Sequence, residues 1–169
     1  STEMKASMKV KSTSLMITQH AEEIEKYLRE YIAPASPIKP DSEKHLEDFI
    51  VENWAHTLLG KDFDIYEEDG EMVGQQYPTN TGPIDILAIS KDKKELLVVE
   101  LKKGRASDKV IGQIQRYMGF IQEKVAKENQ IVRGIIIAAE DDKRIRNALV
   151  VAKNIEFYLY QVSLKLFKL

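Results

Sequence analysis

Two short apolar segments joined by a charged turn constrain the fold of this chain more than any other feature. Residues 84–90 and 95–102 each have the length of one β-strand, and the turn between them suits an antiparallel hairpin. Asp85 lies on the first strand. Glu100 and Lys102 lie on the second, where the alternation of side chains makes them face the same side. Charged groups inside an apolar sheet are unfavourable unless they pair with each other or bind a metal.

Composition limits the kind of protein that carries this hairpin. The 169 residues suit one domain with a sizeable core. There is no cysteine, which excludes disulfides and cysteine-ligated metal sites. Neither a signal peptide nor a membrane-spanning apolar run is present, so we expect a cytoplasmic protein with no membrane contact. The formal net charge of −2 gives no overall nucleic-acid signal.

Breaks in the pattern divide the chain into three parts. Residues 1–17 have the composition of a flexible tail. Residues 18–40 combine a helical arm with a linker that contains three prolines, APASPIKPD. Residues 41–169 form the main domain, in which we expect an α/β fold with a mixed central sheet flanked by helices.

The elements of the main domain follow from hydrophobic periodicity. The segment at 61–70 is polar and acidic, which favours a loop. In chain order we expect a helix from Ser42, strands at 72–77, 84–90 and 95–102, a helix at 110–127, a strand at 132–139, a helix at 142–153, and a strand at 155–162 that continues to 169.

The helix expected from Ser42 carries two acidic residues, Glu43 and Glu47, that are candidates for a functional site. Ser42 suits the N-cap, and Glu43 follows in the first turn, where the helix dipole favours an anion. Glu47 lies one turn further along the same face. Taken alone, the segment explains Glu43 by the dipole and Glu47 as a solvated surface charge. The apolar stripe of the helix consists of Leu46, Phe49, Ile50 and Trp54.

The charged residues on these two apolar strands have two alternative explanations. Glu100 paired with Lys102 or Lys103 would be a structural ion pair with no chemistry. Alternatively, Asp85 and Glu100 would hold Mg2+ or Mn2+, which prefer carboxylate oxygens and retain several waters. Such a cation neutralises a phosphate and activates a bound water. Lys102 would then orient the attacking water, help to deprotonate it or stabilise the developing charge, and the sequence does not choose among these roles.

The sequence gives little support for other classes of hydrolase. The chain has no GxSxG elbow, no Walker loop and no GxGxxG opening a helix, so we expect no nucleotide cofactor. The histidines show no metal-ligand spacing. A local basic cluster follows the second strand and consists of Lys103, Arg105, Lys109 and Arg116. On its own it is explained as a solvated helix entrance, whereas beside an acidic site it favours a rim that steers phosphate.

These residues resemble the PD-(D/E)xK nuclease superfamily. Pro83, Ile84 and Asp85 match its first element, and Glu100, Leu101 and Lys102 match its ExK element. Within the superfamily, the chain is most similar to the C-terminal nuclease domain of the NucS-type endonucleases over roughly residues 42–160. The similarity is carried by SEKHLEDFIVEN at 42–53, TNTGPIDILAIS at 79–90, LVVELKKGRAS at 97–107 and IGQIQRYMGF at 111–120.

The resemblance implies a restriction-endonuclease-like core and a metal-dependent endonuclease that hydrolyses DNA. It makes Asp85 and Glu100 ligands of Mg2+ or Mn2+ and Lys102 the catalytic lysine. Gln113 and Tyr117 match polar positions that contact the site or the scissile phosphate. The third carboxylate is Glu43 by the position of the Ser-Glu pair, with Glu47 as the alternative.

The chain also departs from the NucS type. We expect a short helical arm in place of the N-terminal DNA-binding domain of that type, and the stretch at 60–72 is longer than the corresponding loop. We therefore expect no mismatch recognition, and we expect a homodimer or a partner protein to assist DNA binding. The alternative function is a nucleic-acid- or partner-binding module with a nuclease fold and little activity of its own.

Overall fold

The computed structural model describes residues 42–163 and 165–169 of the chain. The tail expected at 1–17 and the arm and linker at 18–40 lie outside the described residues. The chain divides into two compact units, one of Lys39–Gln161 and one of Ser1–Ile38 with Val162–Leu169. In the second unit, the described residues form no helix or strand.

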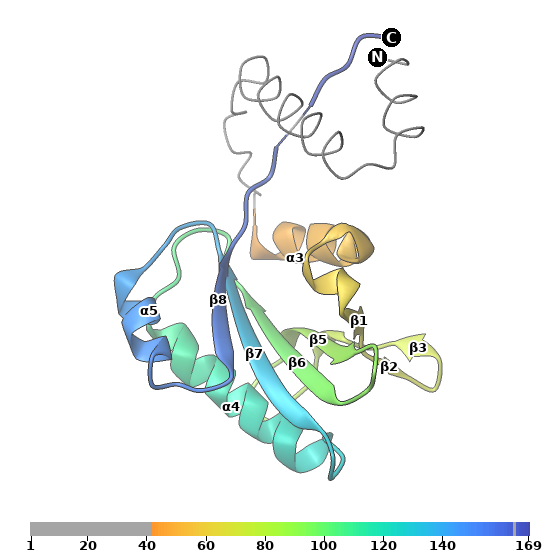
Figure 1. The fold of residues 1–169 in the computed structure, drawn as a ribbon, viewed down its shortest axis with the longest axis vertical. Coiled ribbons are helices and arrows are strands. Elements are labelled where there is room, and N and C mark those ends of the chain that lie inside the picture. The colour runs from red at the N-terminus through yellow and green to blue at the C-terminus, as the bar shows by residue number, and fades with distance from the viewer. Residues whose placement is uncertain (1–41, 164) are drawn as a thin grey trace, which may run out of the picture. The chain divides into compact units, whose positions relative to one another are not determined.

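A mixed six-stranded sheet forms the centre of the larger unit (Figure 1). Its order is β1-β5-β6-β7-β8, and β4 also pairs with β5. The pairs of β5 with β1, β4 and β6 are antiparallel, whereas β6, β7 and β8 run parallel. The strands are β1 (Phe63–Ile65), β4 (Gln75–Tyr77), β5 (Ile84–Ser90), β6 (Glu95–Leu101), β7 (Ile131–Ala138) and β8 (Ile155–Leu159). A separate hairpin joins β2 (Glu67–Glu68) to β3 (Glu71–Met72).

Helices cover both faces of this sheet, which confirms the expected fold class. The apolar core has two parts because alternate strand residues face opposite sides. One part packs Leu96 and Val98 of β6 with α4 (Lys109–Lys124) and α5 (Lys143–Leu149). The other packs Leu97 and Val99 with α3 (Glu43–Glu52) and the 3-10 turns η1 (Trp54–His56) and η2 (Leu59–Lys61). Figure 1 shows α4 and α5 together on one side of the sheet and α3 on the other.

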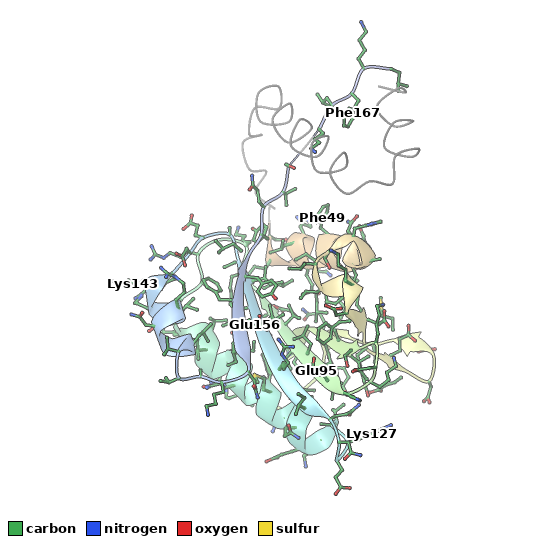
Figure 2. All side chains as sticks on the ribbon, in the orientation of Figure 1. Phe49, Glu95, Lys127, Lys143, Glu156 and Phe167 are labelled. Carbon is green, nitrogen blue, oxygen red and sulfur yellow. The ribbon has the colours of Figure 1, made fainter. Side chains whose placement is uncertain are left out.

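The strands that were expected to be most apolar lie where the sequence predicts them, but several other expectations are wrong. The strand expected at 72–77 is divided between β3, which ends at Met72, and β4, which begins at Gln75 and belongs to another sheet. Phe63 and Ile65 are buried and form β1 within the segment expected to be a loop. Phe49 on α3 is 50% exposed instead of buried (Figure 2). Helix α5 ends at Leu149, short of the expected 153, and β8 ends at Leu159 without continuing to 169. No helix of the described residues has the length and hydropathy needed to cross a membrane.

Candidate active site

Asp85 and Glu100 lie side by side at one end of the antiparallel β5–β6 pair. Ile86 pairs with Val99, so the next position of the register sets Asp85 opposite Glu100 on the face that carries α4. The backbone N–H of Asp85 donates to Glu100 Oε1 at 3.5 Å, and the N–H of Leu101 donates to Asp85 Oδ2 at 2.8 Å. Each carboxylate therefore accepts a hydrogen bond from a backbone N–H of the neighbouring strand.

Burial strongly affects the protonation of this pair. Glu100 is 1% exposed, and burial, followed by the charge of Asp85, raises its pKa to about 8. Burial also raises the pKa of Asp85 to about 6, although the Leu101 N–H opposes the shift and the charge of Glu47 adds to it. Burial therefore favours the protonated form of both carboxyls.

Lys102 follows directly after β6 and is half-buried. Its N–H donates to Ile137 O at 2.8 Å and continues the parallel ladder. The Lys102 charge lowers the pKa of both Asp85 and Glu100, so the ammonium acts on both carboxylates. However, none of the salt bridges of residues 42–163 and 165–169 joins Lys102 to either one. A direct Glu100–Lys102 ion pair is absent from this part of the chain.

The two acidic residues of α3 have different environments. Ser42 caps the helix by accepting a hydrogen bond from the His45 N–H, and Glu43 is exposed in the first turn. Glu47 is 4% exposed, so its interpretation as a solvated surface charge is wrong. Both carboxylates raise the pKa of Asp85, and Glu47 does so more strongly than Glu43. Both therefore act electrostatically on the candidate site.

Two glutamines that the sequence did not single out surround Glu47. Gln75 Nε2 donates to Glu47 Oε1 at 2.8 Å and to Asp48 Oδ1 at 2.7 Å. Gln76 Nε2 donates to Glu47 Oε2 at 2.5 Å and lies 3.4 Å from Asp85 Oδ1. The only local signal is their position just before the GPID segment.

Helix α4 brings Gln113 and Tyr117 toward the start of β5. Tyr117 is 4% exposed and belongs to the core, and Gln113 Nε2 donates to its hydroxyl at 3.5 Å. Gly82 has a φ of +126°, and a Cβ at this position would lie 3.0 Å from the Tyr117 hydroxyl. Tyr117 therefore packs against the turn that precedes Asp85.

The four residues of the basic cluster after β6 differ in their surroundings. Lys109 and Arg116 are exposed on α4. Lys103 is also exposed, and its carbonyl accepts a hydrogen bond from the Tyr160 hydroxyl. Arg105 instead pairs with the buried Asp142 at 3.0 Å, while its side chain stays 59% exposed.

Asp142 anchors this region from the N-cap of α5. It accepts hydrogen bonds from the backbone N–H groups of Arg144 and Ile145 and pairs with the side chains of Arg105 and Arg144. Burial alone would raise the pKa of Asp142, but these donors outweigh it and hold the pKa well below its usual range. The sequence predicted Asp142 only as the start of a helix.

Two carboxylates and a lysine fit a hard divalent cation better than a soft one, because all the anionic donors are oxygens. Nevertheless, the described residues hold no group of three or more His, Cys, Asp and Glu side chains arranged for a metal. A hollow of about 600 Å³ lies elsewhere, lined by residues such as Trp54, Tyr66 and Lys127, and none of the candidate residues lines it. The chemistry of the carboxylate pair, rather than the size of a pocket, marks the candidate site.

The fold and the site define a restriction-endonuclease-like α/β domain. Residues 42–163 match the family described as the Endonuclease NucS C-terminal domain. The chain belongs to this family.

Curated relatives and solved structures agree with this assignment. Endonuclease NucS of Sulfolobus acidocaldarius is 31% identical over 145 residues, which cover 82% of this chain and 51% of the relative. Endonuclease NucS of Methanocaldococcus jannaschii is 32% identical over 81 residues, covering 48% of this chain and 30% of the relative. The chain thus spans about half or less of the length of these relatives.

Two solved structures are similar in fold. A repair endonuclease from Pyrococcus abyssi superposes with a TM-score of 0.54 at 21% identity, covering 76% of this chain and 50% of that one. A structure described as an EndoMS–dsDNA complex superposes with a TM-score of 0.56 at 21% identity, covering 76% and 48%. At this level of identity the likeness concerns the fold.

Proposed function

We propose that this domain is a divalent-metal-dependent nuclease that hydrolyses phosphodiester bonds in DNA. The observation that carries the proposal is the pair formed by the buried Glu100 and the half-buried Asp85, neither of which has a salt-bridge partner among the described residues. Crowded carboxylates with raised pKa values are unfavourable in a metal-free protein and are common at functional sites. Membership of the NucS C-terminal domain family supports DNA as the substrate.

Each residue has a distinct role in this proposal. Asp85 and Glu100 would hold Mg2+ or Mn2+, with Glu43 or Glu47 supporting them from α3. The bound cation would neutralise phosphate charge and lower the pKa of a coordinated water. Lys102 would orient or deprotonate the attacking water or stabilise the developing charge.

The surrounding residues would position the substrate. Gln113 would contact the scissile phosphate, and Tyr117 would fix the turn before Asp85. Lys103, Arg105, Lys109 and Arg116 would contact the DNA backbone without reading its sequence. We expect a second copy of the chain or a partner protein to extend this surface.

A cleavage assay tests the proposal. Labelled single-stranded, duplex and mismatched DNAs are incubated with the protein in Mg2+, Mn2+ or EDTA. We expect cleavage only with metal, and a loss of roughly a hundredfold or more in Asp85→Asn because metal assistance contributes several kcal/mol. The control is Asp64→Asn, an exposed carboxylate on β1. Cleavage in EDTA, or equal rates in wild type and Asp85→Asn, would contradict the proposal.

The second candidate is a nucleic-acid- or partner-binding module with little activity of its own. It is favoured by one observation, namely that the described residues offer no ready group of three metal-binding side chains. Calorimetry with Mn2+ separates the candidates. A module predicts no Mn2+ binding, or binding that Asp85→Ala leaves unchanged, whereas the nuclease predicts binding that Asp85→Ala removes.

A further inference from the structure

The adjacent residues Gln75 and Gln76 of β4 both donate hydrogen bonds to the carboxylate of Glu47. Neighbouring residues of a regular extended strand could not do so. Successive strand residues point to opposite faces. Yet Gln75 donates to one oxygen of Glu47 and Gln76 to the other. The backbone explains this, because Gln76 has a φ of +53° and so leaves the extended conformation within the strand.

That backbone conformation is unfavourable for glutamine. A residue with a Cβ is strained in the left-handed region, and such strain persists only where the surroundings enforce it. Glycine or asparagine would be the usual choice at such a position. In this conformation the Gln76 amide contacts Glu47 and Asp85, which a glycine or an asparagine at this position would not reproduce in the same way.

The Gln76 amide lies between two carboxylates of the candidate site. Its Nε2 donates to Glu47 Oε2 and also lies 3.4 Å from Asp85 Oδ1, a longer and weaker contact. Glu47 is buried and Asp85 is half-buried, so their like charges repel with little screening. An NH2 group between them offers each one a donor. Gln75 provides a natural comparison, because it reaches Glu47 and Asp48 but not Asp85.

We propose that Gln76 is a positioning residue of the metal site, whose amide joins the buried Glu47 to Asp85 and holds the Asp85 carboxylate in place before a cation binds. This inference rests on the proposed function. Gln76 acts through Asp85 and Glu47 and is not itself a catalytic residue. Removing its side chain frees Asp85 to move away from Glu47.

The first test needs no metal. The Leu101 N–H donates to Asp85 Oδ2 at 2.8 Å, so its hydrogen exchange reports the position of Asp85. We compare wild type, Gln76→Ala, Gln76→Gly and Gln75→Ala in EDTA. Gln76→Gly removes the side chain and relieves the left-handed strain, which keeps the test valid if Gln76→Ala does not fold. We expect faster Leu101 exchange in both Gln76 variants and unchanged exchange in Gln75→Ala.

The second test measures Mn2+ affinity by calorimetry on the same proteins. Partners that orient metal ligands typically contribute 10- to 100-fold to affinity, so we expect about tenfold weaker binding in the Gln76 variants. Gln75→Ala removes a contact with Glu47 but none with Asp85, so it should weaken Mn2+ binding less than the Gln76 variants do. Binding by Gln76→Gly that is equal to or tighter than that of Gln75→Ala would overturn the positioning role.

The two tests separate this inference from the function on which it rests. Wild type that binds no Mn2+ would overturn the proposed nuclease, while Leu101 exchange would still support or overturn the positioning of Asp85. Wild type that binds Mn2+ while Gln76→Gly leaves both exchange and affinity unchanged would overturn the inference alone.

Discussion

Asp85 and Glu100 lie opposite one another at the end of the β5–β6 ladder, and the N–H of Asp85 donates to Glu100 Oε1 at 3.5 Å. Two carboxyls are thereby fixed at close range by backbone geometry. Among the described residues, no salt bridge neutralises the charge of either carboxylate. The pair is therefore a source of instability in the metal-free protein.

Neutralising Glu100 should stabilise the metal-free protein at high pH. Its folded pKa of about 8 lies above its ordinary value of 4.5, so the folded state holds this proton more tightly than the unfolded state. The contribution of this proton to the free energy of unfolding is fully present below about pH 4 and is lost as the pH rises through 8. We expect Glu100→Gln to raise the free energy of unfolding by roughly 2–4 kcal/mol at pH 8 and little at pH 4, measured by urea unfolding in EDTA.

Asp64→Asn serves as the control for this measurement, since Asp64 is half-exposed and pairs with Lys91 on the surface. It should change stability by less than about 1 kcal/mol at either pH. A structural ion-pair cluster predicts the opposite outcome, with Glu100→Gln destabilising the protein at pH 8.

Lys102→Ala should abolish DNA cleavage without abolishing Mn2+ binding. The ammonium acts on both carboxylates but is not a metal ligand, so its loss removes its action on the attacking water. Rates are measured with Mn2+ in excess, and affinity by calorimetry. Lys94→Ala, in the exposed turn between β5 and β6, is the matched control and should retain both properties. Equal cleavage by the Lys102 and Lys94 variants would remove Lys102 from the mechanism.

Gly82→Ala should destabilise the turn that precedes Asp85. A Cβ at a φ of +126° is strained, and it would also lie 3.0 Å from the Tyr117 hydroxyl. We expect a loss of about 1–3 kcal/mol in urea unfolding. Tyr117→Phe removes the hydroxyl, so the double variant should recover part of this loss. Strictly additive effects would show that the Gly82–Tyr117 contact does not matter.

Asp142→Asn should lower stability near neutral pH, because the buried carboxylate holds two arginines and caps α5. Its pKa is lowered in the folded state, so its contribution is present above the usual aspartate pKa and is lost as the pH falls toward the folded value. The difference between wild type and variant should therefore shrink in acid, as measured by thermal unfolding. Asp141→Asn, whose side chain is 53% exposed and pairs with Arg146, should show little effect at any pH.

Lys109→Ala and Arg116→Ala should weaken DNA binding without changing Mn2+ affinity. Each phosphate contact that is lost should reduce the slope of log affinity against log salt by about one. This slope is measured by fluorescence anisotropy of labelled DNA at several salt concentrations, in a buffer without divalent metal ions. Lys124→Ala, in the last turn of α4, is the control. A slope that changes equally in all three variants would argue against a specific rim.

The fold was predictable where burial is encoded locally. The expected strand at 84–90 agrees with β5 at both ends, and those at 95–102 and 132–139 agree with β6 and β7 within one residue. These strands are almost continuously apolar, so their own sequence predicts burial. Strand β1 was missed because its three residues, Phe-Asp-Ile, lie in an acidic segment and become a strand by pairing with β5.

The sequence by itself determined the Asp85, Glu100 and Lys102 constellation, because strand alternation and a hairpin connection depend only on neighbouring residues. The tertiary structure alone decided the environment of Glu47, which is buried beneath glutamines 28 and 29 positions away. It also decided the left-handed backbone of Gln76 and the pairing of Arg105 with Asp142. Such contacts join segments that are brought together by packing, so no local periodicity encodes them.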